Sequence, residues 1–215
     1  KHIFSVLQSA EKVEELPRAV ADFSEVPLPT FHKQLQHQDT AAIIYVQGDK
    51  QFENDKEQAY FILVSQILAP FSFNFLRSEK QLGYLAGSGY MPICNVAGLV
   101  IYVQSHEYTH EQLLSELKEC LKLFIDELSN MSQEEFKHHL QAVTHQYNEK
   151  PNNMAQNAQQ LWIAIGNKDT FFNQKTLIAD ALSQLTLNDV YEWSKERLLD
   201  NEFHGALLSS STKTN

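Results

Sequence analysis

The chemically most conspicuous pattern in this sequence is His106-Glu-Tyr-Thr-His110, which satisfies the arrangement H-E-x-x-H. On a helix, two histidines at this spacing reach one Zn²⁺ ion while the glutamate polarises a bound water, which is the chemistry of metal-assisted hydrolysis. That chemistry requires all five residues to be helical. Thr109, with Gln112 three residues later, is a better helix start, so His106 falls outside the helix. We therefore expect a loop here and no metal site in the chain.

A second group of histidines offers fewer possible metal ligands than this motif. Glu135-x-x-His138 has the spacing of half a carboxylate di-iron site, but such a site needs a partner motif on a neighbouring helix and further inward-facing glutamates. His145 lies seven residues after His138 and could share its face. Two histidines without a third ligand are usually solvated or hydrogen-bonded to neighbours. We expect an exposed helix face.

Three glycines, Gly83, Gly87 and Gly89, are spaced through one short stretch. Their spacing matches neither a phosphate-binding loop nor a nucleophile elbow. Within a strand, such glycines indicate bulges or a close approach of another backbone. The sequence also contains no inverted zinc motif, H-x-x-E-H, and no basic stripe with interleaved aromatic residues of the kind that binds nucleic acid.

The remaining candidate is the segment Phe75-Leu-Arg77-Ser-Glu-Lys-Gln81-Leu-Gly83-Tyr84. It reads as the end of a helix running into a strand. Arg77 falls in the last helical turn, where a cation suits the helix dipole, and Gly83 permits a sharp entry into the strand that Tyr84 begins. The residues alone favour a structural interpretation, in which Arg77 pairs with a carboxylate and Tyr84 packs its ring against the sheet.

The helices and strands that must position these residues can be predicted from the spacing of apolar residues and from the capping residues, prolines and glycines that end each element. Apolar alternation and branched residues predict strands, and helical spacing with capping boxes predicts helices. Pro70 should kink or break its helix, and Gly166 should stand just after the end of another. The predicted strands are 41–46, 82–90 and 97–105, the last two forming a hairpin, with a further strand over 204–210. The predicted helices are 1–16, 55–78, a helix opening at 109, and those over 132–149, 154–165 and 186–199.

This order predicts an α+β fold, with an antiparallel-rich mixed sheet and helices packed on one face. Residues 1–30 are interpreted as an N-terminal helix and a proline-containing linker from a preceding domain, and residues 31–215 as one α+β domain. The chain begins without an initiator methionine and inside a helical pattern, so we interpret it as a piece of a longer protein.

Composition narrows the classes of partner. The hydrophobic content of 43% and the formal net charge of −10 are those of a folded, acidic protein, which would be repelled by phosphate backbones and anionic lipids. No apolar run approaches the roughly 20 residues that span a bilayer. We expect neither nucleic acid nor membrane as a partner. Cys94 and Cys120 are expected to be buried free thiols.

The run from Gln66 to Tyr84, with its Pro70, Asn74, Leu-Arg77 and Gln-Leu-Gly-Tyr84 positions, resembles the last-domain signature of pitrilysins and insulysins. The similarity extends over about residues 41–199. Members of this family contain four homologous α+β domains that enclose a peptide chamber, and the first domain bears the inverted zinc motif. The resemblance implies that Arg77 and Tyr84 reach into that site, where they hold the substrate backbone and stabilise the developing oxyanion.

The resemblance thus implies a non-catalytic, substrate-enclosing domain of a zinc-dependent endopeptidase that degrades peptides. Zinc would be bound in a missing N-terminal domain, the partners would be peptide substrates and the N-terminal catalytic half of the same polypeptide, and the fragment alone would be inactive. A second hypothesis is a pseudo-peptidase interaction module without catalysis, and a third is a free-standing zinc enzyme using His106, Glu107 and His110. The family implies a periplasmic location, with a cytoplasmic one as the alternative.

Overall fold

The computed structural model describes residues 20–23, 29–36, 38–49, 55–167, 169, 171–199 and 205–212. One five-stranded sheet runs through these residues in the order β1-β5-β2-β4-β3. The strands β1 and β5 are parallel, and every other neighbouring pair is antiparallel. Their bounds are Thr30–Leu35 for β1, Thr40–Gln47 for β2, Leu85–Tyr90 for β3, Gly98–Ser105 for β4 and Gly205–Thr212 for β5.

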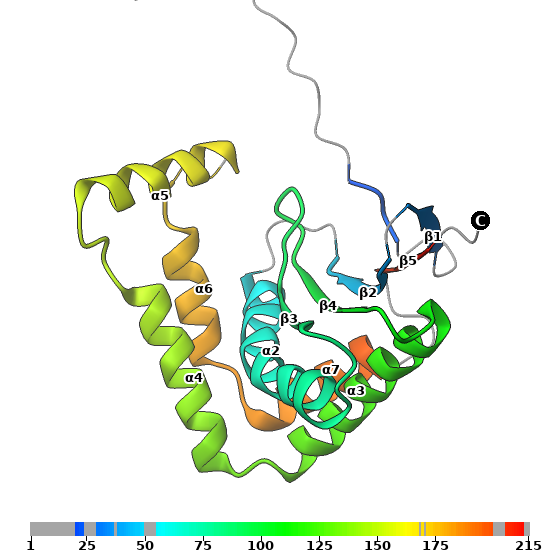
Figure 1. Ribbon diagram of the computed structural model, residues 1–215. Helices are drawn as coiled ribbons and strands as arrows, with labels where there is room; N and C mark the ends of the chain where they lie inside the picture. Colours follow the sequence, from blue (N-terminus) through cyan, green and yellow to red (C-terminus); the bar gives the residue numbers. More distant parts are fainter. Residues whose placement is uncertain are drawn as a thin grey trace, which may run out of the picture.

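The helices pack beneath the sheet and beside it (Figure 1). Their bounds are Asp55–Phe73 for α2, Asn74–Glu79 for the π-helix η1, His110–Asn130 for α3, Gln133–Asn148 for α4, Met154–Gly166 for α5, Gln174–Ser183 for α6 and Leu187–Leu199 for α7. In Figure 1, α2, α3 and α7 lie under the strands, whereas α4 and α6 form an outer layer from which α5 projects. The expected α+β fold with a mixed, antiparallel-rich sheet is confirmed.

The core lies between the sheet and α2. Alternate residues of β4, among them Leu99, Ile101 and Val103, are buried, while those between them are half-buried. This period-two pattern presents one face of the strand to the helices. Phe61 and Leu68 of α2 are fully buried against that face, so the central helix and the central strands form one continuous apolar cluster.

Pro70 does not break its helix, contrary to one of the two outcomes expected for it. The helix α2 continues to Phe73 and then widens into η1 up to Glu79. Most of α2 is buried, and tertiary packing of this kind outweighs the roughly 3 kcal/mol that an internal proline costs. By length and hydropathy the stretch Asp55–Glu79 could also cross a bilayer. However, 61% of its most apolar window is buried inside the domain, as in the core helix of a globular fold.

Several local predictions hold. Thr109 caps α3 in a capping box with Gln112, and Ser132 and Thr186 accept hydrogen bonds at the starts of α4 and α7. The predicted hairpin is β3–β4, although β3 begins at Leu85 rather than at residue 82. The predicted strand in the tail is β5.

Other local predictions are wrong. The strand β1 and the helix α6 were not expected. Gly166 is the last helical residue of α5, and Asn167 is its C-cap with a negative φ. Cys120 is buried as expected, but Cys94 is exposed, because it lies in the tight β3–β4 turn with a φ of 48°. The predicted helix 1–16 and most of the linker lie outside the described residues, and the domain boundary at residue 30 stays a prediction.

Candidate functional site: the turn from Arg77 to Tyr84

The segment from Phe73 to Leu85 joins the core helix to an outer strand of the sheet. It opens with η1, in which the Lys80 backbone N–H donates to the Phe75 carbonyl 2.9 Å away, and the Leu82 N–H then donates to the Leu76 carbonyl at 3.0 Å. These bonds span five and six residues, so the chain here is wider than an α-helix. Short π-helical turns of this kind occur frequently at functional sites.

Buried anchors fix this turn to the body of the domain. Phe75, Leu76 and Leu82 are each 5% exposed or less. Lys80 Nζ lies 3.0 Å from a Glu116 carboxylate oxygen and 3.3 Å from one of Glu119, both on α3. Hydrogen bonding to Glu116 raises the pKa of Lys80, so this ammonium stays charged at neutral pH. The turn is therefore held by apolar contacts on one side and by an ion-pair cluster on the other.

Arg77 lies in the last turn of η1, as predicted, and its side chain is exposed. Among the described residues, no carboxylate forms an ion pair with it, so the structural interpretation of a carboxylate partner is wrong. Its guanidinium carbon instead lies 5.0 Å from the ring centroid of Phe73. A cation–π contact of this kind orients the guanidinium but leaves its N–H donors available.

Tyr84 follows a backbone conformation that few residues can adopt. Gln81 has a φ of 52°, and a Cβ on Gly83 would lie 1.9 Å from the carbonyl oxygen of Gln104. The close approach of β4 thus requires glycine at position 83, as the spacing of glycines suggested. Tyr84 itself is 72% exposed, because the strand begins one residue later. It does not pack against the sheet, so the structural interpretation of this residue is also wrong.

The two exposed side chains offer complementary hydrogen-bond donors. The guanidinium carries a permanent charge and several N–H groups, and the phenol carries one O–H group. Both project from a turn that Lys80 and Leu82 anchor between them. Such a pair can donate to carbonyl oxygens of an extended peptide, and the charged donor binds an oxygen more strongly as negative charge develops on it.

The H-E-x-x-H motif does not form a ligand set. His106 lies in the loop after β4, and His110 is the first residue of α3. Each imidazole pairs with its neighbouring glutamate, and the His110 ring also contacts the ring of His32 on β1, with 4.2 Å between centroids. Within the described part of the chain, no three His, Cys, Asp or Glu side chains are grouped as they would be around a metal ion.

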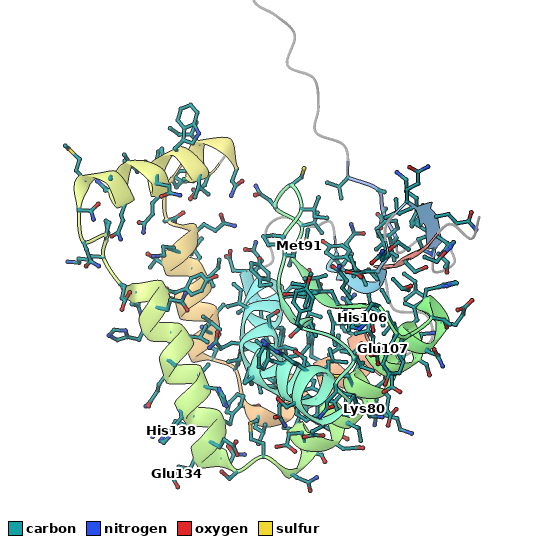
Figure 2. All side chains as sticks on the ribbon, viewed as in Figure 1. Lys80, Met91, His106, Glu107, Glu134 and His138 are labelled. Atoms are coloured by element: carbon teal, nitrogen blue, oxygen red, sulfur yellow. The ribbon has the colours of Figure 1, made fainter. Side chains whose placement is uncertain are left out.

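The other histidine motif lies elsewhere. Figure 2 shows His138 and Glu134 on α4, on the side of the molecule away from His106 and Glu107. Glu135, His138 and His145 are all exposed on that helix, and His145 pairs with Glu149. This is the solvated helix face that the sequence predicts.

The structure also contains a cavity of about 580 Å³ that the sequence did not predict. It lies where the tip of the β3–β4 hairpin meets the helices α4, α5 and α6. Its walls come from six separate segments, so no local sequence pattern predicts the cavity. The nearest indication is the amide-rich run Asn152-Asn-Met-Ala-Gln-Asn-Ala-Gln-Gln160, of which Asn157 and Gln160 face the cavity.

Comparison with known proteins relates this fold to one family. Residues 63–162, which include Arg77 and Tyr84, match the family model described as PQQ synthase PqqF-like, C-terminal lobe domain 4. The chain is 26% identical over 200 residues to the insulin-degrading enzyme of Bos taurus, covering 90% of this chain and 19% of that protein. It is 27% identical over 153 residues to the putative zinc protease mug138 of Schizosaccharomyces pombe, covering 71% of this chain and 16% of that protein. The chain thus spans about a fifth of the length of these curated relatives.

Solved structures share the fold. A crystal structure of pitrilysin superposes with a TM-score of 0.81 at 21% identity, over 98% of this chain and 22% of that one. The peptidase M16 inactive domain from Pseudomonas fluorescens superposes with a TM-score of 0.68 at 16% identity, over 99% of this chain and 49% of that one. The matched positions, the fold and the relatives agree, and the chain is similar to C-terminal domains of the pitrilysin/insulinase family of peptidases.

Proposed function

We propose that this chain is the non-catalytic, substrate-enclosing domain of a zinc-dependent endopeptidase that degrades peptides. The observation that carries the proposal is the pair of exposed donors, Arg77 and Tyr84, on one anchored turn. In the parent enzyme they would hold the substrate backbone and stabilise the oxyanion that forms at the scissile carbonyl. The anchored backbone between them matters because a donor that is already positioned needs little rearrangement when charge develops.

In this proposal zinc is bound outside the chain. The described residues contain no fitting ligand set, and the H-E-x-x-H motif is split between a loop and a helix start. A zinc ion in the parent would supply Lewis-acid activation of water and of the substrate carbonyl. This chain would supply donors to the substrate and part of the wall that excludes bulk water. We expect the isolated chain to be inactive and to lose zinc on mild chelation.

The outer face of α5 supports a larger parent protein. This helix has no buried residue, and Trp162 and Ile165 are 75% and 57% exposed. Ala155 and Ala158 precede them at helical spacing, so the four form one apolar stripe. Since the chain spans about a fifth of its relatives, the occupant that we propose for this stripe is the N-terminal half of the same polypeptide.

Kinetics of the full-length parent test the roles of Arg77 and Tyr84. We expect Arg77→Ala to lower kcat by roughly 100-fold, and Tyr84→Phe by roughly 10-fold, because each removes a donor to the oxyanion. The value of KM should change less than kcat. Lys122→Ala, an exposed cation on α3, and Tyr102→Phe, a half-buried tyrosine on β4, are matched controls. Unchanged cleavage in both test variants would rule out the proposed roles.

A second function is favoured by one specific comparison. The solved relative from Pseudomonas fluorescens is described as an inactive domain, and this chain shares its fold. The chain could therefore serve as a pseudo-peptidase interaction module in a larger assembly. The residues that precede position 1 in the parent discriminate between the two functions, because an intact H-x-x-E-H favours the enzyme and a degenerate one favours the scaffold.

A further inference from the structure

The cavity between the hairpin and α5 has a size suited to ligands. Its volume of about 580 Å³ lies within the roughly 300–1,000 Å³ of pockets that bind small molecules and short segments. It is lined by one residue of α2, the β3–β4 hairpin, the end of α4, one face of α5, the α5–α6 connection and α6. Seventeen residues line it, and most of their polar groups are side-chain amides and phenols.

The two charged groups of the lining are already engaged. The Asp169 carboxylate accepts hydrogen bonds from the backbone N–H groups of Phe171, Phe172 and Gln174 at the start of α6. Lys175 Nζ donates to the carbonyl of Glu149 at 3.4 Å. The lining thus carries one charge of each sign, so an occupant of a single charge gains no net attraction from it. The cavity therefore favours an uncharged occupant.

The remaining polar groups are amides and phenols. Among the described residues, the side chains of Gln146, Asn157 and Gln160 have no hydrogen-bond partner. Burial raises the pKa of Tyr147 to about 12 and that of Tyr90 further still, so both phenols keep their protons at neutral pH and can donate. Primary amides both donate and accept, and this mixed set matches the alternating N–H and C=O groups of a peptide backbone.

The position of the cavity relates it to the candidate site. Tyr84 immediately precedes β3, and Tyr90 ends β3 in the cavity wall. Six strand residues rise by about 20 Å in all at roughly 3.3 Å each. Among the described strands, β3 pairs only with β4 and lies at the edge of the sheet. An extended peptide that contacts Tyr84 and runs alongside β3 reaches the cavity with a residue about six positions away.

We propose that this cavity binds an uncharged, extended segment of a peptide, distal to the segment that Arg77 and Tyr84 contact. The proposal names a second substrate subsite and so rests on the proposed function for its biological meaning. Binding to the cavity itself can be measured in the isolated chain. Peptides with uncharged side chains about six positions from the cleaved bond are the expected substrate class.

The test titrates the chain with a short acetylated and amidated peptide of leucine, glutamine and asparagine, followed by calorimetry and by NMR. We expect saturable binding at one site per chain. Ala164→Phe places a ring in the cavity and should weaken binding by roughly 10-fold or more. Ala158→Phe makes the same change on the exposed stripe of the same helix and should leave binding unchanged. A peptide of equal length made of glutamate and lysine should bind more weakly.

A second variant covers the case in which Ala164→Phe does not fold, which circular dichroism reports. Tyr147→Phe keeps the ring and removes one donor, and should weaken binding by about 2- to 10-fold. Absence of saturable binding in the millimolar range, or equal weakening by Ala164→Phe and Ala158→Phe, would overturn the proposal. So would tighter binding of the charged peptide.

The proposed subsite and the proposed role of Arg77 can be refuted independently of each other. Arg77→Ala should leave binding of the short peptide unchanged, because that peptide is too short to extend from the cavity to the turn. If the cavity binds peptide while Arg77→Ala leaves cleavage by the parent intact, the role of Arg77 is refuted and the subsite stands. If Arg77→Ala abolishes cleavage while the cavity binds nothing, the reverse holds.

Discussion

The guanidinium carbon of Arg77 lies 5.0 Å from the ring centroid of Phe73, one turn earlier on the same helical segment. Phe73 is 44% exposed, although a large apolar side chain at a helix end is usually covered when its only function is packing. Its ring therefore contributes little to the core. In our interpretation it holds the cation that the peptide backbone would contact.

Replacement of Phe73 tests this relationship. Phe73→Ala should lower kcat/KM of the parent by about 2- to 5-fold, the value of an exposed cation–π contact. The free energy of unfolding of the isolated chain should change little, because the ring is exposed. Phe73→Tyr keeps an aromatic face and is the matched control. In the Arg77→Ala background Phe73→Ala should have no further effect, and an additive loss would show that the ring acts independently of the guanidinium.

Alanine substitution at two glycines of the same stretch should affect the stability of the chain differently. A Cβ on Gly83 would meet the Gln104 carbonyl oxygen at 1.9 Å, whereas one on Gly89 would meet nothing within 4 Å. Gly83→Ala should therefore lower the free energy of unfolding by about 1–3 kcal/mol, since backbone must shift to admit the methyl group. Gly89→Ala should be neutral or slightly stabilising. Urea denaturation of the two variants checks this, and equal midpoints would contradict the close approach of β4.

The two thiols should differ in reactivity. Cys94 is exposed in the hairpin turn, while Cys120 is buried on α3, and burial raises the pKa of Cys120 to about 12. Because the thiolate is the reactive form, a disulfide reagent at mildly alkaline pH should titrate one thiol in the native chain and the second only after unfolding. Cys94→Ser should abolish the rapid reaction, and Cys120→Ser should preserve it. Two equally rapid thiols would contradict the burial of Cys120.

The sequence predicted elements whose determinants are local. The capping box of Thr109 and Gln112 sets the start of α3 by contacts within one turn, and this start also places His106 outside the helix. The family resemblance singled out Arg77 and Tyr84 as candidates, and the structure shows why composition could not reveal their exposure. Their exposure depends on the π-helical turn and on the position of β4 behind Gly83.

The elements that the sequence missed depend on distant partners. The strand β1 is exposed along its length and has no buried face to produce alternation. It exists because it pairs in parallel with β5, where Thr30 lies opposite Leu207. The cavity is also non-local, since Tyr90 and Gln160 meet across it from widely separated segments. Contacts of this kind leave no periodic pattern in the residues that make them.

Alkaline pH should destabilise the chain through its buried phenols. Burial raises the pKa values of Tyr45 and Tyr147 to about 12, against about 10 in an unfolded chain. A raised folded-state pKa means that the native state holds its proton more tightly. The resulting stabilisation is fully present below about pH 10 and is lost as the pH rises toward about 12.

Measurement of the free energy of unfolding between about pH 9 and pH 12 checks this window. Tyr147→Phe should reduce the decline, because it removes one of the titrating groups while keeping the ring. Tyr84→Phe is the matched control and should leave the decline unchanged, since Tyr84 is 72% exposed. An equal effect of the two substitutions would show that Tyr147 is solvated.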